Sequence, residues 1–212
     1  MKMRKIIVST LVLFAFAACK KEAPPETPNP GEKLIWSTEK QRPQWTYTEV
    51  ETKGDRVAFM AMSDKYSTEK YARDDAEQAA RKKAVQYSST KVKSMVKNVI
   101  DQVGKGSQII DPDRVQREYE KQISEGGISQ LKPTSWYLEK WQDAQSAVYW
   151  KAFVLAEIPK SVLDESLAEV MRAQRAKLQE QKSAARDINS KEVADAMMKA
   201  FEEIERNGFS LD

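Results

Sequence analysis

A long alanine-spaced helix is the feature that most constrains the fold of this chain. Helical periodicity runs from about residue 68 to about residue 103, with Ser67 as the expected N-cap and glycines at 104 and 106 ending it. One face carries small residues in the first half and valines in the second: Ala72, Ala76, Ala79, Ala80, Ala84, Val92, Val96, Val99 and Val103. Because small residues let a helix lie close to a sheet, we expect the first half to pack on strands.

The segments around this helix predict a small, mostly antiparallel sheet of about four strands. Residues 44–51 and 56–63 are β-rich and enclose a turn, which predicts a hairpin. Residues 128–141 and 147–158 predict a second strand pair, and the latter is apolar on both faces, so it is the expected central strand. The predicted fold class is α+β, with a long helix packed on the sheet and a helical C-terminal extension.

An Asp-Pro-Asp turn follows the long helix. Asp113 and Gln116 have the spacing of a capping box, which predicts a short helix that ends before Gly126. Asp111 and Asp113 are also oxygen ligands of the kind that hard cations prefer, but a calcium loop needs further oxygens at set spacings, and these do not follow. A turn with an N-cap is therefore the preferred interpretation.

The chain from Ser161 onward is predicted to be helical. Residues 172–186 are mostly polar and predict a solvated helical extension, and Asn189 with Glu192 forms a second capping box that opens the final helix. The possible partner face on this helix is an apolar stripe: Val193, Met197, Phe201 and Ile204. Two interpretations stay open, because the stripe either folds back onto the domain or binds a partner or a second copy.

The N-terminus carries the only cysteine of the chain. A basic start and a short apolar run, residues 6–16, precede Ala18 and Cys19, which is the layout of a signal peptide spanning residues 1–18. The layout resembles the lipobox of bacterial lipoproteins, which implies cleavage after Ala18 and lipidation of Cys19. Lys20 makes the outer membrane the expected location by analogy, with the periplasmic or surface face undecided. The alternative is a signal peptide cut elsewhere that leaves a free thiol.

A proline-rich segment follows the cysteine. Residues 19–42 contain four prolines among charged and polar residues, which predicts an extended tether between the membrane and the domain. Residues 34–36 are apolar and interrupt the tether, so they are candidates for a short latch on the domain. The remaining predicted divisions are an α+β domain over residues 43–160 and a helical segment over residues 161–212.

Composition excludes several function classes. The chain has no histidine and one cysteine, so the commonest general base, the commonest zinc ligands and thiol chemistry in the mature domain are excluded. There are 35 basic and 32 acidic residues, and three of the basic ones lie in the signal peptide, so the mature chain has no net charge. Nucleic acid is therefore not an expected partner. We predict no catalytic residue, no metal and no cofactor.

Two elements together suggest a family. Residues 42–45, Arg-Pro-Gln-Trp, open the domain, and the alanine-spaced residues 72–89 precede a hydrophobic strand pair. This pattern resembles the small bacterial lipoproteins typified by the twenty-kilodalton outer-membrane lipoprotein antigen, which are similar to the N-terminal domain of the flagellar H-ring assembly protein. The resemblance covers residues 43–160. It implies a compact α+β domain and a non-enzymatic envelope scaffold or assembly accessory that acts through protein contacts.

The five tryptophans offer an alternative function. Tryptophan rings stack on sugar faces, and an envelope lipoprotein would lie near peptidoglycan, so glycan binding is the main alternative to protein contacts. Four of the five fall in predicted strands, where burial is the ordinary explanation: Trp45, Trp136, Trp141 and Trp150. Trp36 lies in the predicted tether and has no such explanation.

Overall fold

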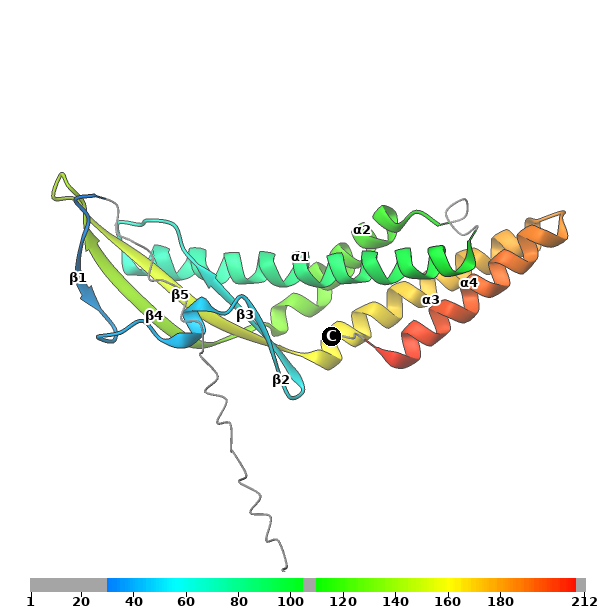
Figure 1. Ribbon diagram of the computed structural model, residues 1–212, viewed down its shortest axis with the longest axis horizontal. Helices are drawn as coiled ribbons and strands as arrows, with labels where there is room; N and C mark the ends of the chain where they lie inside the picture. The colour runs from blue at the N-terminus through cyan, green and yellow to red at the C-terminus, as the bar shows by residue number, and fades with distance from the viewer. Residues whose placement is uncertain (1–29, 105–109, 209–212) are drawn as a thin grey trace, which may run out of the picture.

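The computed structural model describes residues 30–104 and 110–208, and its centre is one antiparallel five-stranded sheet (Figure 1). The strand order is β1-β4-β5-β3-β2, so the predicted central strand, β5, lies in the middle. The predicted cleavage and lipidation residues, Ala18 and Cys19, lie outside the described residues. The strands are β1 (Lys33–Ser37), β2 (Val50–Lys53), β3 (Arg56–Met62), β4 (Lys132–Gln142) and β5 (Val148–Pro159).

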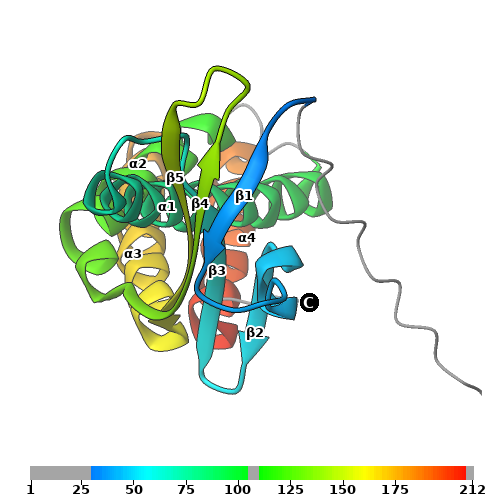
Figure 2. The same ribbon diagram turned by 90° about the vertical axis from the view of Figure 1, so that its left-hand side faces the viewer.

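The long helix α1 (Glu69–Val103) crosses one face of this sheet, as its alanine spacing predicts (Figures 1 and 2). Four alanines spaced one turn apart are fully buried and let the helix approach β3 and β5: Ala72, Ala76, Ala80 and Ala84. The side chain of Thr68 caps the helix by accepting a hydrogen bond from the Tyr71 amide, so the N-cap lies one residue beyond the predicted Ser67. Gly104 ends the helix in the left-handed region, with φ of 78°, which favours glycine.

The second half of α1 packs on helices instead of strands. These helices are α2 (Pro112–Gln122), α3 (Lys160–Ala184) and α4 (Ile188–Asn207). The helix α1 contacts α2 and α4, and α3 contacts both of those helices (Figure 1). A single hydrophobic core joins the two halves of the molecule, since it contains Val154 of the sheet, Val96 of α1 and Phe201 of α4.

The final helix folds back onto the chain. Val193, Met197 and Phe201 are buried in the common core, and Ile204 packs against it, so the stripe is not a free partner face. The prediction that residues 172–186 are solvated is wrong for one face of the helix, because Leu178 on that face is 1% exposed. The reason is that α4 runs antiparallel beside α3 and covers an apolar stripe that is too sparse to be recognised alone (Figure 1).

The apolar residues predicted to interrupt the tether form the fifth strand. The strand β1 pairs with β4, with Leu34 opposite Trp141 and Trp36 opposite Lys140, so Ile35 is an extra residue in a bulge. The following segment crosses the sheet face opposite α1, where a 3₁₀ turn at Gln44–Tyr47 packs on β3 and β5. The predicted tether, residues 19–42, therefore ends in ordered structure.

Four further element starts are corrected. The strand predicted over residues 128–141 begins later, because Ile128–Gln130 forms a 3₁₀ turn and β4 starts at Lys132. The first hairpin strand is shorter than residues 44–51, because Thr46 donates to the Pro43 carbonyl and closes the 3₁₀ turn before β2. Asp111, not Asp113, caps α2, since Pro112 takes the first helical position. Asp187, not Asn189, caps α4, and its carboxylate accepts a hydrogen bond from the Ser190 amide at 2.7 Å.

Candidate functional site

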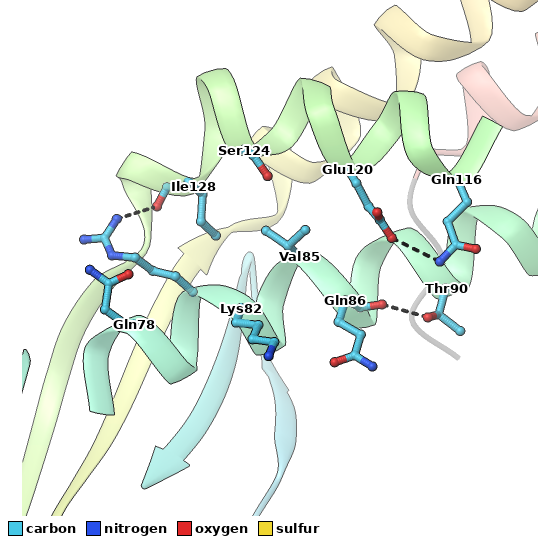
Figure 3. A pocket seen from close by; sticks show the side chains of 10 residues that line it. Gln78, Lys82, Val85, Gln86, Thr90, Gln116, Glu120, Ser124 and Ile128 are labelled. Carbon is cyan, nitrogen blue, oxygen red and sulfur yellow. Dashed lines mark hydrogen bonds between the residues drawn. The ribbon is translucent and has the colours of Figure 1, made fainter. Parts of the chain in front are cut away.

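An open groove with a volume of about 690 Å³ lies between α1 and α2 (Figure 3). We call it the α1–α2 groove. It lies on the side of α1 that the sheet does not cover, and it receives side chains from both helices and from the π-helical turn Ile123–Gly127 with the 3₁₀ turn Ile128–Gln130. Its lining residues are Gln78, Arg81, Lys82, Val85, Gln86, Thr90, Gln116, Glu120, Ser124 and Ile128.

Two polar contacts hold the walls of the groove together. At one end, Arg81 Nη1 donates to the Ile128 carbonyl at 3.3 Å while Nη2 binds Glu77 at 2.6 Å. At the other end, Glu120 Oε1 accepts hydrogen bonds from Ser89 Oγ at 2.9 Å and from a Gln116 amide at 3.1 Å. The first contact joins α1 to the 3₁₀ turn after α2, and the second joins α1 to α2, so both ends of the groove are held.

The interval between these contacts limits what the groove could hold. Arg81 and Ser89 are eight positions apart on α1, which is about 12 Å along a helix. That distance accommodates about four residues of extended chain or about two helical turns. Figure 3 shows Val85 pointing toward α2, with Ile128 beside it at one end of the same space, so this part of the groove is apolar.

The polar lining of the groove is mostly neutral. Gln78, Gln86 and Gln116 each provide an amide that donates and accepts, and Thr90 and Ser124 provide hydroxyl groups. Such groups match the alternating donors and acceptors of a polypeptide backbone. Across residues 30–104 and 110–208, no three histidine, cysteine or acidic side chains are arranged to hold a metal ion.

A second, smaller groove lies on the other side of the α1 side chains Gln86 and Thr90. It has a volume of about 450 Å³ and runs between α1 and the β2 edge, where Val50, Tyr87 and Lys91 line it. Gln86 and Thr90 line both grooves. Figure 3 shows Gln86 directed away from α2, so α1 has polar side chains toward both grooves.

Exposed apolar side chains gather at a different place, the corner of the sheet where β1 begins. We call it the β1 corner and define it by Leu34, Ile35, Trp36 and Val148, with Trp150 beside them. The ring of Trp36 contacts the ring of Trp150 edge to face, with centroids 5.5 Å apart, and the Lys140 ammonium lies 5.3 Å from the Trp150 ring centroid. Trp36 pairs with Lys140, and Lys140 with Trp150, so all three side chains share one face.

The other predicted sugar-binding tryptophans are less available. Trp141 is buried and donates its indole N–H to Glu139 at 2.9 Å, while Trp45 and Trp136 are half-buried. The ring of Trp136 is also covered by Arg73, whose guanidinium carbon lies 4.8 Å from the ring centroid. Among the described residues, the strongly exposed tryptophan is Trp36.

Sequence reasoning did not find the α1–α2 groove. Its residues lie on the polar sides of two helices. The sequence pattern of a polar helix face is the same whether that face lines a groove or is exposed to bulk water. The final-helix stripe that was a candidate partner face is instead core, with Met197 and Phe201 fully buried. Asp111 and Asp113 cap and open α2, and Asp113 also binds Lys93.

None of the described helices has the length and apolar character needed to cross a bilayer. Comparison of the chain with protein-family models, with curated proteins and with solved structures found no match.

Proposed function

We propose that this chain is a lipid-anchored protein of the bacterial envelope that binds a segment of a partner protein in the α1–α2 groove. In this role it acts as a scaffold or assembly accessory, without catalysis. Lipidation at Cys19 and an outer-membrane location come from the N-terminal sequence. The family resemblance of residues 43–160 implies the same kind of role and stays a prediction.

The amide-rich lining of the groove is the observation that carries the proposal. A peptide segment of about four residues would find an apolar floor at Val85 and hydrogen-bonding partners at Gln78 and Gln116. The contacts of Arg81 and Glu120 hold the two walls in place before binding, which reduces the ordering cost on association.

Site-specific photocrosslinking in cells tests the groove. A photoreactive residue at Ser124, inside the groove, should give a discrete protein adduct, whereas the same residue at Ser183, on the exposed side of α3, should not. The adduct at Ser124 should be lost when Thr90→Arg fills the groove. The matched control is Ser183→Arg, because both hydroxyls are exposed on helices and donate to the carbonyl four residues earlier. Equal adducts at both positions, or an adduct that survives Thr90→Arg, would reject the groove as the binding site.

The anchor is tested separately at Cys19. Cys19→Ala should end incorporation of labelled fatty acid and should leave the signal peptide uncleaved after Ala18. If labelling continues in this variant, the lipoprotein proposal is wrong, whatever the groove binds.

Glycan binding is the second candidate function, and the exposure of Trp36 is the observation that favours it. The exposed ring of Trp36 contacts the ring of Trp150 edge to face, which leaves one face of the Trp36 ring available for stacking on a sugar. Retention on purified peptidoglycan should then fall in Trp36→Ala but not in Tyr71→Ala, which removes another exposed aromatic ring. Retention that is equal in both variants and in the wild type would reject this candidate.

A further inference from the structure

Four of the six exposed large apolar side chains among the described residues lie at the β1 corner, and the other two, Tyr71 and Ile188, lie elsewhere. Leu34 is 40% exposed, Ile35 is 42% exposed, Trp36 is 47% exposed, and Val148 is 40% exposed. Leu34, Ile35 and Trp36 are consecutive along the β1 edge, and Val148 lies two strands away, because Lys33 pairs with Gln142 and Gln142 pairs with Val148. Leu34 pairs with Trp141 and Trp36 with Lys140, so these two side chains flank the edge on opposite faces of the sheet. A cluster of exposed apolar side chains of this kind marks an interaction site.

The two edges of the sheet differ in a way that favours this interpretation. The opposite edge, β2, presents Glu51, Thr52 and Lys53, which are exposed and polar, as edge strands of soluble proteins usually are. The β1 edge presents apolar residues at three consecutive positions. These apolar side chains therefore need a surface that covers them.

The bulge in β1 disfavours an added strand as the occupant. Ile35 has no partner residue of its own on β4, so the ladder is interrupted in the middle of a five-residue strand. A bulge twists an edge and breaks the regular row of donors and acceptors that a second strand or a second copy needs. Sugar stacking would use only Trp36 and would leave the aliphatic side chains of Leu34, Ile35 and Val148 unexplained.

The position of the corner along the chain points to a lipid surface. Residues 20–32 separate Cys19 from β1, and thirteen residues span at most roughly 45 Å when fully extended and about 20 Å as a flexible chain. A lipid on Cys19 would therefore keep the corner near the bilayer at a high effective concentration, so that a weak apolar contact is sufficient. The ring of Trp36 and the amines of Lys33 and Lys140 suit the boundary between acyl chains and headgroups.

We propose that the β1 corner lies on the membrane surface, with Leu34, Ile35 and Trp36 entering the headgroup boundary; this inference rests on the lipid anchor proposed above. It sets an orientation for the whole molecule. Figure 1 shows β1 at one end of the elongated molecule and the turn between α3 and α4 at the other. The helix α1, about 50 Å long, thus extends from the membrane-facing end and holds the α1–α2 groove clear of the bilayer.

Fluorescence quenching in vesicles tests this orientation. The lipidated full chain is reconstituted into vesicles of phosphatidylethanolamine and phosphatidylglycerol with brominated acyl chains, which quench tryptophans that reach the headgroup boundary. We expect quenching in the wild type and loss of most of it in Trp36→Phe. Ile35→Ser, which keeps the ring but removes an apolar neighbour, should also reduce quenching. The matched control is Ile188→Ser, because Ile188 is 75% exposed at the far end of the molecule.

Flotation of the same vesicles separates the two proposals. Protein that floats with the vesicles but shows no quenching has an anchor and no membrane-facing corner, which overturns the inference alone. Protein that does not float and is not quenched overturns the anchor and the inference together. Two other results also overturn it: a dimer in sedimentation that Ile35→Ser dissolves, or peptidoglycan retention that Trp36→Phe abolishes while quenching is absent.

Discussion

Arg42 and Glu139 form a bidentate ion pair on the sheet face opposite α1. Arg42 Nε donates to one carboxylate oxygen of Glu139 at 2.9 Å, and Nη2 donates to the other at 3.0 Å. Glu139 is 2% exposed and also accepts the indole N–H of Trp141, while the Arg42 guanidinium lies over the ring of Phe153. This pair fixes the segment after β1 across the sheet.

Removing the arginine alone should be costly, because it leaves a buried carboxylate without its cation. We expect Arg42→Met to lower the free energy of unfolding by about 3–5 kcal/mol in urea titrations followed by circular dichroism. Adding Glu139→Leu to this variant should recover much of the loss, since no buried charge then remains. The control is Glu51→Gln, whose partner Lys53 is exposed, with an expected change below about 1 kcal/mol. If Arg42→Met and Glu51→Gln lower the free energy of unfolding by similar amounts, Arg42 contributes no more than a surface charge.

The final helix should contribute strongly to stability. Phe201 is fully buried between α4 and the rest of the core, so Phe201→Ala should cost about 3–5 kcal/mol and lower the thermal midpoint by roughly 10 °C. Ile188→Ala, at the exposed start of the same helix, should leave the midpoint nearly unchanged. Removal of residues 187–212 should likewise lower the midpoint. A truncated chain that melts like the wild type would contradict the packing of α4 described above.

Alkaline unfolding should depend on Tyr119. Burial raises the pKa of this phenol well above its ordinary value of about 10, more than its hydrogen bond with Ser88 lowers it. Because the pKa of Tyr119 is higher in the folded state than in the unfolded state, the neutral phenol stabilises the fold fully below the unfolded-state pKa. As the pH rises above about 10, the unfolded chain ionises first and this stabilisation is lost. Tyr119→Phe should therefore weaken the fall in stability above that pH. Tyr71→Phe, at an exposed position, should leave the alkaline transition where it is.

The two adjacent glycines after α2 should respond differently to alanine. A methyl group at Gly127 would lie 3.0 Å from Val162 Cγ1 and 3.3 Å from Ile123 Cγ1, both of which are packed in the core. We expect Gly127→Ala to destabilise the protein by about 1–3 kcal/mol through overpacking. At Gly126 the same methyl group meets nothing within 4 Å, so Gly126→Ala should be neutral or slightly stabilising. Thermal melts of the two variants that coincide would contradict this difference.

The sequence by itself determined the elements whose signal is local. The alanines of α1 repeat every turn, so both the existence of the helix and the face that packs on the sheet could be read from their spacing. The apolar residues on both faces of β5 likewise predicted the central strand, because a strand buried on both faces must be apolar on both. Element starts were less certain, since Asp111 and Asp113 are both good caps and only the fixed backbone of Pro112 separates them.

Only the tertiary structure decided where the outlying segments pack. In the sequence alone, β1 is only an apolar interruption of a predicted tether, and its strand pairing depends on the free edge of β4. In the same way, α4 is an amphipathic helix with no evident partner in the sequence, and α3 provides the surface on which it packs. The α1–α2 groove depends on two contacts, from Arg81 on α1 to the turn at Ile128 and from Ser89 on α1 to Glu120 on α2, and neither helix alone encodes them. Periodicity records which face of an element is buried, whereas the identity of the partner depends on surfaces far away in the chain.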